Sequence, residues 1–155
     1  MGAPARVGRP QAMLFACGSN AVRSPMAAAL ARHLFGKSTY VASAGVRKGE
    51  LDAFAVAAME EFGLDITRHC PMTFEELEDW EGLNFDLIIT LTPEAHHKAL
   101  DLTRTIAAEV EYWPTPDPTI VEGSRVQRLD AYRDVRDQLM RRIKKRFLLA
   151  VAGNE

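Results

Sequence analysis

The strongest constraint on this chain is a short turn near its start, where an apolar run meets a helical pattern. The run Met13–Ala16 is typical of a buried strand, and the residues from Met26 to His33 have the composition of a helix. The turn that joins them reads Cys17-Gly-Ser-Asn-Ala-Val-Arg-Ser-Pro25. This arrangement predicts a strand that passes directly into a helix.

The same alternation continues along the chain. Further strands are expected at 39–43, 85–91 and 110–113, and further helices at 51–62, 73–80, 94–105 and 127–151. Strands that alternate with helices form parallel sheets that are covered on both faces. We therefore predict an α/β fold, a three-layer sandwich with a four-stranded parallel sheet flanked by helices. Residues 11–152 are assigned to one domain and residues 1–10 to a disordered N-terminal lead.

The turn after the first strand combines a nucleophile with a cation. Ser24 is expected to cap the helix and Pro25 to occupy its first position, so that free N–H groups and the positive end of the helix dipole face the turn. This field and the Arg23 guanidinium favour the thiolate form of Cys17. The turn is therefore predicted to bind a tetrahedral oxyanion such as phosphate or sulfate, although a free cysteine is more often a small buried hydrophobe.

The composition limits the partners of such a site. The chain has 155 residues, a formal net charge of −2, two cysteines and no long apolar stretch. These features predict a cytoplasmic protein that binds neither nucleic acid nor a membrane. The basic run 141–146 is interpreted as a solvated helix face, because Leu139, Ile143, Phe147 and Val151 keep helical spacing around it.

Other strand-end loops are candidates for the remaining chemistry, because ligands gather at the carboxyl ends of parallel strands. The loop after the fourth strand holds Asp117 between Pro116 and Pro118. Two prolines stiffen the backbone there, which suits a general acid, whereas an aspartate in such a loop is ordinarily a turn residue. His96 and His97 diverge around a helix and are interpreted as solvent-facing, and neither a metal site nor a cofactor is expected.

These residues resemble a known family, the low-molecular-weight protein tyrosine phosphatases, together with the arsenate reductases built on the same fold. Four motifs carry the resemblance: the turn from Cys17 to Pro25, Ser43-Ala-Gly45, the segment 63–69, and Asp117-Pro118. The resemblance covers residues 12 to 147 and implies the fold of these phosphatases. It also implies hydrolysis of a phosphomonoester through a cysteinyl-phosphate, with a phosphoprotein among the candidate substrates.

The resemblance implies a role for each matching residue. Cys17 would be the nucleophile, Arg23 the phosphate clamp and Asp117 the general acid. Ser24 would hydrogen-bond the Cys17 sulfur, while Ser43 and His69 would support the loop. The phosphate would be bound through the loop backbone, in which one asparagine holds an unusual conformation: Gly18, Ser19, Asn20, Ala21, Val22 and Arg23.

The chain departs from the family pattern at several positions. Ser19 stands where a glycine is common, so Gly18 is expected to relieve the loop backbone, and Val22 stands where many members have a second cysteine. The segment 46–50 lacks the aromatic wall of phosphotyrosine phosphatases, and Thr119 replaces a tyrosine that often follows Asp-Pro. A preference for phosphotyrosine therefore does not follow from the sequence.

Three functions stay open at this point. The first is a phosphomonoester hydrolase, and the second is a single-cysteine arsenate reductase that uses a small-molecule thiol. A thioredoxin-coupled cysteine relay is excluded, because residues 91–99 contain no cysteine and only Cys70 remains. The third is a phosphate-binding module without turnover. A disulfide between Cys17 and Cys70 under oxidation is a further hypothesis, although a buried inert cysteine is commoner.

Overall fold

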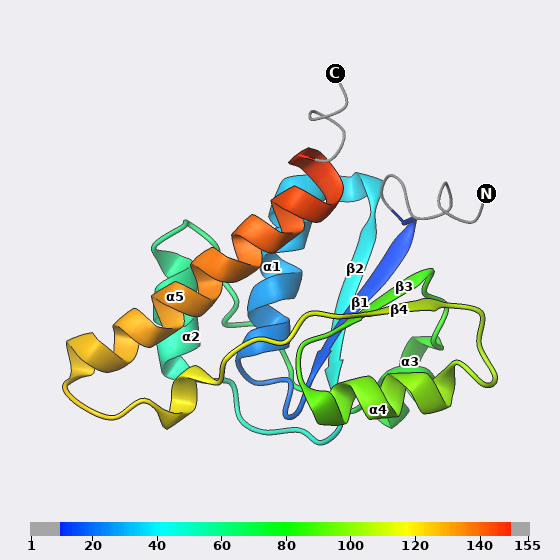
Figure 1. The fold of residues 1–155 in the computed structure, drawn as a ribbon, viewed down its shortest axis with the longest axis horizontal. Coiled ribbons are helices and arrows are strands. Elements are labelled where there is room, and N and C mark those ends of the chain that lie inside the picture. Colours follow the sequence, from blue (N-terminus) through cyan, green and yellow to red (C-terminus); the bar gives the residue numbers. More distant parts are fainter. Residues whose placement is uncertain (1–9, 150–155) are drawn as a thin grey trace.

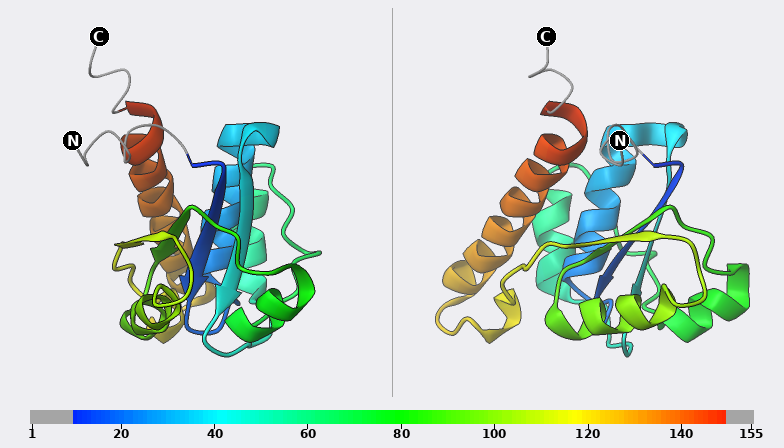
Figure 2. Two further views of the ribbon diagram at one scale, coloured as in Figure 1. Left: turned by 90° about the vertical axis from the view of Figure 1, so that its right-hand side faces the viewer. Right: turned by 45° about the vertical axis from the view of Figure 1, so that its right-hand side comes forward.

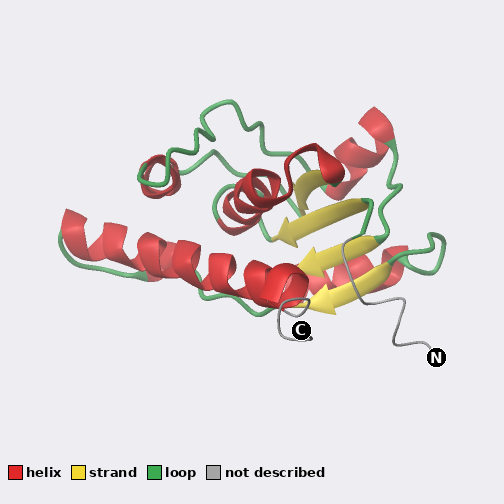
Figure 3. Cartoon of the chain, turned by 90° about the horizontal axis from the view of Figure 1, so that it is seen from above, coloured by secondary structure: helices red, strands yellow, loops and turns green. Residues whose placement is uncertain are grey.

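The computed structural model describes residues 10–149, which form an α/β fold (Figure 1). Four strands form one sheet in the order β2-β1-β3-β4: β1 (Ala12–Cys17), β2 (Tyr40–Gly45), β3 (Leu87–Thr90) and β4 (Glu109–Tyr112). All neighbouring strands are parallel, and their arrows point the same way in Figure 3. The predicted four-stranded parallel sheet is therefore confirmed.

Helices cover both faces of the sheet, which a parallel sheet requires because both faces are apolar. One face packs against three helices: α1 (Arg23–Phe35), α2 (Ala53–Glu60) and α5 (Arg125–Ile143), the last followed by π-helix at Lys144–Leu149. The other face packs against α3 (Phe74–Glu81) and α4 (Pro93–Leu102). Figure 2 shows the two groups on opposite sides, so the sandwich has three layers.

The side chains of β1 alternate between the two cores. Met13, Phe15 and Cys17 face the core of α1, α2 and α5, whereas Leu14 and Ala16 face the core of α3 and α4. This alternation is the period of a strand buried on both faces. It places Cys17, the last residue of the strand, on the side of the sheet from which α1 departs.

Capping residues explain where several helices begin. A capping box begins α3, since the Thr73 side chain accepts from the Glu76 N–H and the Glu76 carboxylate accepts from the Thr73 N–H. Thr92 caps α4, since its side chain accepts from the Ala95 N–H. The helix expected at 127–151 begins earlier, at Arg125, because Ser124 forms a second capping box with Gln127. Residues 1–9 of the expected lead and Val151 lie outside the described residues.

Two interpretations of surface polar residues need correction. The His96 ring stacks on Tyr112 with 4.8 Å between centroids, and its Nδ1 lies 3.0 Å from Thr90 Oγ1, so only His97 faces solvent. In the basic run, the Arg146 guanidinium is 2.8 Å from the Glu111 carboxylate, which lies beneath it on β4. The sequence pattern missed these contacts because residues on the strands β3 and β4 supply the partners.

Among the described residues, none of the helices is both long enough and apolar enough to cross a membrane.

A cluster of charges joins the end of α2 to α5. The Glu61 carboxylate lies 2.6 Å from Arg133 Nη2 and 2.8 Å from Arg136 Nη1. Hydrogen bonds from Arg133, and then from Arg136, lower the pKa of Glu61 from 4.5 to about 2. A carboxylate whose pKa is lower in the folded state stabilises the fold at pH values above its unfolded pKa and loses that effect on acidification.

We expect Glu61→Gln to make the protein less stable at pH 6 and to reduce the loss of stability between pH 4.5 and pH 2, the interval set by the shifted pKa. Urea unfolding at pH 6 and pH 3 measures this difference. Glu60→Gln is the matched control, because its exposed side chain makes no ion pair with another described residue. Equal acid sensitivity in wild type and Glu61→Gln would contradict the assignment.

Candidate active site

The candidate nucleophile lies at the carboxyl end of β1, in the interior of the sheet. Cys17 is only 2% exposed, and its Sγ lies 3.0 Å from Ser24 Oγ on the first turn of α1. α1 begins at Arg23, with Val22 at the N-cap and no side-chain cap. The expectation that Ser24 caps the helix is therefore wrong. Ser24 lies within the first turn of α1, and its hydroxyl contacts the Cys17 sulfur instead.

The loop between β1 and α1 is held by its carbonyl groups. The carbonyl oxygens of Cys17, Gly18, Ser19 and Ala21 accept hydrogen bonds of 2.9–3.2 Å from backbone N–H groups in the segment 46–52. Within the part of the chain that the structure describes, the N–H groups of residues 18–22 have no protein acceptor. Buried N–H groups require partners, so these donors are available to an anion at the start of α1.

Asn20 is the centre of this loop. Its φ is 56°, which is the left-handed region that asparagine tolerates better than most residues. Its side-chain Nδ2 donates to Ser24 Oγ at 2.8 Å and to Ser43 Oγ at 3.0 Å. Its Oδ1 accepts from the Met72 N–H at 2.9 Å. One fully buried amide thus joins the loop to α1, β2 and the segment before α3.

His69 contacts the same residue from outside the loop. Its Nε2 lies 2.9 Å from the Asn20 carbonyl oxygen. Burial lowers the pKa of His69, the Asn20 carbonyl raises it and the Arg32 charge lowers it, with a net decrease. The structure therefore brings Ser24, Ser43 and His69 together around Asn20.

Of two glycines near the loop, Gly45 is required because backbone atoms approach it closely, whereas Gly18 faces only the flexible end of a side chain. A Cβ at Gly45 would lie 2.8 Å from the Asn20 nitrogen, and a Cβ at Gly18 would lie 2.6 Å from Glu94 Oε1. Gly18 has no positive φ, and Asn20 is the one non-glycine residue among those described that does. The expectation that Gly18 relieves the loop backbone is therefore wrong, since Asn20 takes the left-handed position.

Arg23 and Asp117 face each other across the loop. Arg23 Nη1 donates to the Thr115 carbonyl oxygen at 2.9 Å, and Arg23 Nη2 lies 4.0 Å from Asp117 Oδ2. Asp117 Oδ1 accepts from the Thr119 N–H at 2.9 Å and from the Thr119 hydroxyl at 2.6 Å. Burial raises the pKa of Asp117, but the Thr119 hydrogen bonds and the Arg23 charge outweigh it, so the net pKa is lower than usual.

These residues border one pocket of about 210 Å³. Its lining contains no aromatic side chain and consists of Cys17, Gly18, Ser19, Val22, Arg23, Arg47, Asp117 and Thr119. Arg47 Nη1 holds both carboxylate oxygens of Glu94 at 2.9 Å, which forms a charged rim beside Gly18. The residues expected for anion binding and acid catalysis therefore meet at one opening.

Several contributors to the site were not found from the sequence. The Thr115 carbonyl and the Met72 N–H are backbone groups, so no side-chain pattern marks them. Arg47 lies in the segment 46–50, where a lone arginine beside a lysine forms no pattern that marks a binding site. No group of three or more described His, Cys, Asp or Glu residues is arranged to hold a metal ion. Both cysteines are free, with Cys17 buried and Cys70 exposed.

Comparison with known proteins decides the family. A family model described as low molecular weight phosphotyrosine protein phosphatase matches residues 12–152. The chain belongs to this family. This is a family of cysteine-based enzymes, and it includes both phosphatases and arsenate reductases.

Relatives of both kinds are similar to the chain. An arsenate reductase of Shouchella clausii is 34% identical over 131 residues, which cover 84% of this chain and 91% of that protein. A low molecular weight protein tyrosine phosphatase from T. tengcongensis has a TM-score of 0.70 at 25% identity, covering 87% of this chain and 96% of that one. An arsenate reductase in the phosphate-binding state has a TM-score of 0.66 at 27% identity, with 87% and 95% coverage.

Replacing Asn20 separates its two contributions to the loop. Asn20→Gly keeps the left-handed backbone but leaves buried hydroxyls and the Met72 N–H without a partner, so we expect the free energy of unfolding to fall by about 1–3 kcal/mol. Asn20→Ala should cost about 1–2 kcal/mol more, because alanine is strained at positive φ.

Urea denaturation monitored by tryptophan fluorescence measures both effects. Asn84→Ala, which changes an exposed asparagine, is the control and should alter stability by less than about 0.5 kcal/mol. If the glycine variant is as stable as wild type, Asn20 does not hold the loop through its side chain.

Proposed function

We propose that this protein hydrolyses phosphomonoesters through a cysteinyl-phosphate on Cys17. The observation that carries the proposal is the shared pocket of Cys17, Arg23 and Asp117 at the end of β1. Phosphoryl transfer needs a nucleophile in line with the leaving group, positive or N–H groups around the equatorial oxygens, and a proton for the leaving oxygen. Each requirement has a separate residue in this pocket.

The loop is the proposed phosphate-binding element. The N–H groups of residues 18–22 lack protein acceptors, so they can donate to phosphate oxygens without losing other bonds. The Thr115 carbonyl holds Arg23 Nη1 and leaves Nη2 on the side of Asp117. A guanidinium fixed in this way offers a directional donor to an oxyanion.

Transfer from the substrate forms a bond between the Cys17 sulfur and phosphorus. The bond from phosphorus to the ester oxygen breaks, and Asp117 donates its proton to that oxygen. Thr119 and Arg23 favour the ionised form of Asp117 in the free protein. The negative charge of a bound phosphate opposes this effect, because a like charge nearby raises the pKa of a carboxyl.

The second step releases phosphate. The Asp117 carboxylate takes a proton from water, the water oxygen attacks phosphorus, and the bond between phosphorus and sulfur breaks. The Ser24 hydroxyl, 3.0 Å from the sulfur, can donate to the thiolate that leaves. The thiolate needs no external reductant or metal in this sequence of steps.

The substrate is proposed to be a phosphomonoester whose body lies outside the pocket. A volume of about 210 Å³ is below the about 300–1,000 Å³ of sites that enclose a whole small molecule. A phosphorylated side chain of a protein would fit this description, because the rest of the protein remains on the surface. The charged rim of Arg47 and Glu94 gives no aromatic wall for a tyrosine ring.

Removing the proposed acid gives a direct test. We expect Asp117→Asn to slow hydrolysis of an aryl phosphate by about 10²- to 10⁴-fold, the usual effect of losing a positioned general acid. Cys17→Ser should abolish turnover. Steady-state rates between pH 5 and pH 8 measure both. If wild type turns over no faster than Cys17→Ser, the protein is a phosphate-binding module and not a hydrolase. If Asp117→Asn hydrolyses the substrate at the wild-type rate, another residue is the general acid.

A second candidate is a single-cysteine arsenate reductase, which the 34% identity to an arsenate reductase favours. Arsenate would lose a hydroxyl group as Cys17 sulfur bonds to arsenic. Two equivalents of a small-molecule thiol would then supply two electrons and leave as a disulfide, which releases arsenite and restores Cys17. The thiol has to come from solution, because Cys70 is the one other cysteine in the chain.

Arsenate-dependent disulfide formation tests this candidate. A reductase is expected to produce one arsenite and one disulfide per turnover with at least one small-molecule thiol, and Cys17→Ala should not. Cys70→Ala is the control and should retain activity, because Cys70 has no place in the proposed steps. Absence of arsenite with monothiols and dithiols alike would remove this function.

A further inference from the structure

A second pocket lies between α1 and the segment that follows α2. Its volume is about 560 Å³, which is more than twice that of the Cys17 pocket and within the usual range for small-molecule sites. Two kinds of side chain line it. The apolar ones are Pro25, Ala29, Leu64 and Ile66, and the polar ones are Arg32, His33, Asp65, Arg68 and His69.

The positive charges of this pocket exceed its negative charge. Asp65 supplies the one carboxylate of the lining, and its Oδ1 is already occupied by the Thr67 N–H at 2.8 Å and the Thr67 hydroxyl at 2.6 Å. Within residues 10–149, neither Arg68 nor His33 has a carboxylate at ion-pair distance. A pocket with this balance favours an anionic ligand.

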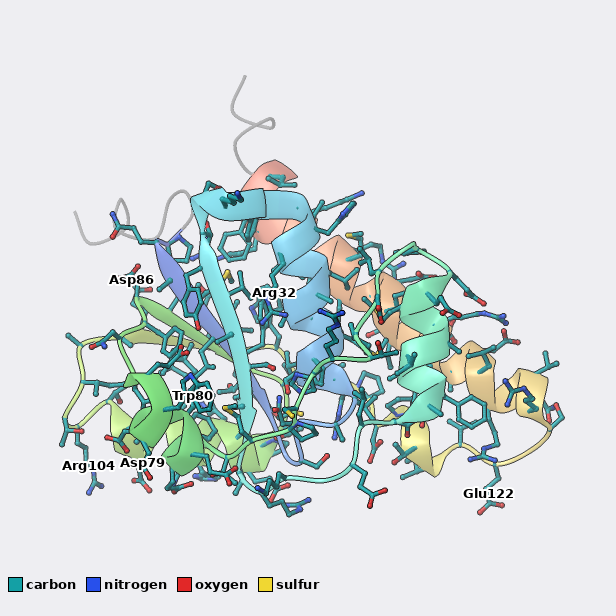
Figure 4. The ribbon with its side chains drawn as sticks, turned by 180° about the vertical axis from the view of Figure 1, so that it is seen from behind. Arg32, Asp79, Trp80, Asp86, Arg104 and Glu122 are labelled. Atoms are coloured by element: carbon teal, nitrogen blue, oxygen red, sulfur yellow. The ribbon has the colours of Figure 1, made fainter. Side chains whose placement is uncertain are left out.

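The Arg32 side chain lines this pocket and is held in a fixed position. Its Nε and Nη2 both donate to the Val41 carbonyl oxygen, at 3.2 and 2.9 Å, which fixes the plane of the guanidinium. Its Nη1 makes no hydrogen bond with any described residue. Figure 4 shows Arg32 beside α1 on the face of the molecule opposite to the view of Figure 1. A fixed guanidinium with an available donor is suited to bind an oxyanion, because little side-chain entropy is lost.

We propose that this pocket binds an organic phosphate. The phosphate group of this ligand lies between Arg32 and Arg68. The apolar part of the ligand packs against Pro25, Leu64 and Ile66. The apolar wall distinguishes this ligand from a bare inorganic ion, which has no surface to place there. The site is separate from the Cys17 pocket, since the two linings share no residue.

The ligand would contact a residue that also contacts the candidate active site. His69 lines the pocket, and its Nε2 lies 2.9 Å from the Asn20 carbonyl oxygen of the Cys17 loop. A phosphate beside the ring would raise the fraction of protonated His69, because an opposite charge favours the charged form. Arg32, Arg68 and His33 oppose this protonation and Asp65 favours it. The His69 titration is therefore a direct readout of occupancy.

The test uses the full chain with Arg23→Ala, which removes the guanidinium of the Cys17 pocket and leaves the second pocket intact. Phenylphosphonate is the probe, because its carbon–phosphorus bond is not hydrolysed. Two-dimensional NMR is expected to show saturable shifts at residues 64–69 and a rise in the His69 pKa. Inorganic phosphate is the second arm and should bind more weakly, since it lacks the apolar body.

Two further variants carry the same Arg23→Ala background. Arg68→Ala should weaken the probe about tenfold or more, the effect of losing one hydrogen bond to a charged group. Arg104→Ala is the matched control, because Figure 4 places this exposed arginine well away from Arg32. Absence of saturable shifts at 64–69, equal weakening by both variants, or equal binding of phosphate and phenylphosphonate would overturn the proposal. These outcomes do not depend on whether the wild type hydrolyses phosphate esters.

Discussion

The candidate active site depends on one buried amide, the side chain of Asn20. A loop that binds an anion through its N–H groups has to turn those groups toward one point, which costs backbone freedom and requires one residue at positive φ. Asn20 takes that conformation and is held there by Ser24, Ser43 and Met72. The same side chain that shapes the loop therefore also fixes it to a strand and a helix.

The binding of an anion here does not depend on the charge of the whole protein. The chain has a net charge of −2, so long-range attraction of phosphate is not available. Attraction is local instead, because N–H groups of the segment 46–52 donate to the loop carbonyls and leave the loop N–H groups free. Arg23 adds one full positive charge at the edge of these donors.

The hydrogen bonds that orient Asp117 also oppose the protonated form that a general acid needs. The Thr119 hydrogen bonds orient its carboxyl toward the pocket, but they also favour the ionised form. A general acid has to be protonated, so the proposed reaction requires the bound phosphate to offset these bonds and the Arg23 charge. This arrangement links the protonation of the acid to the presence of the substrate, since a like charge within reach raises the pKa only when the pocket is filled.

The sequence by itself determined the parallel α/β sandwich and the position of Cys17 and Arg23 on one turn, because both follow from local hydrophobic period and from neighbours a few residues apart. It also marked Asp117 through its two flanking prolines, and it indicated Ser43 and His69 by resemblance. It placed Ser24 as a cap and Gly18 as the flexible position, since those are the ordinary local roles of serine and glycine. The resemblance also implied the hydrogen bond between Ser24 and the Cys17 sulfur and the unusual conformation of Asn20, and the structure shows both. Only the tertiary structure decided that the Thr115 carbonyl holds Arg23 and that the Met72 N–H holds the Asn20 side chain. These two contacts join residues 92 and 52 positions apart and each uses a backbone group, so no local pattern in the sequence can specify them.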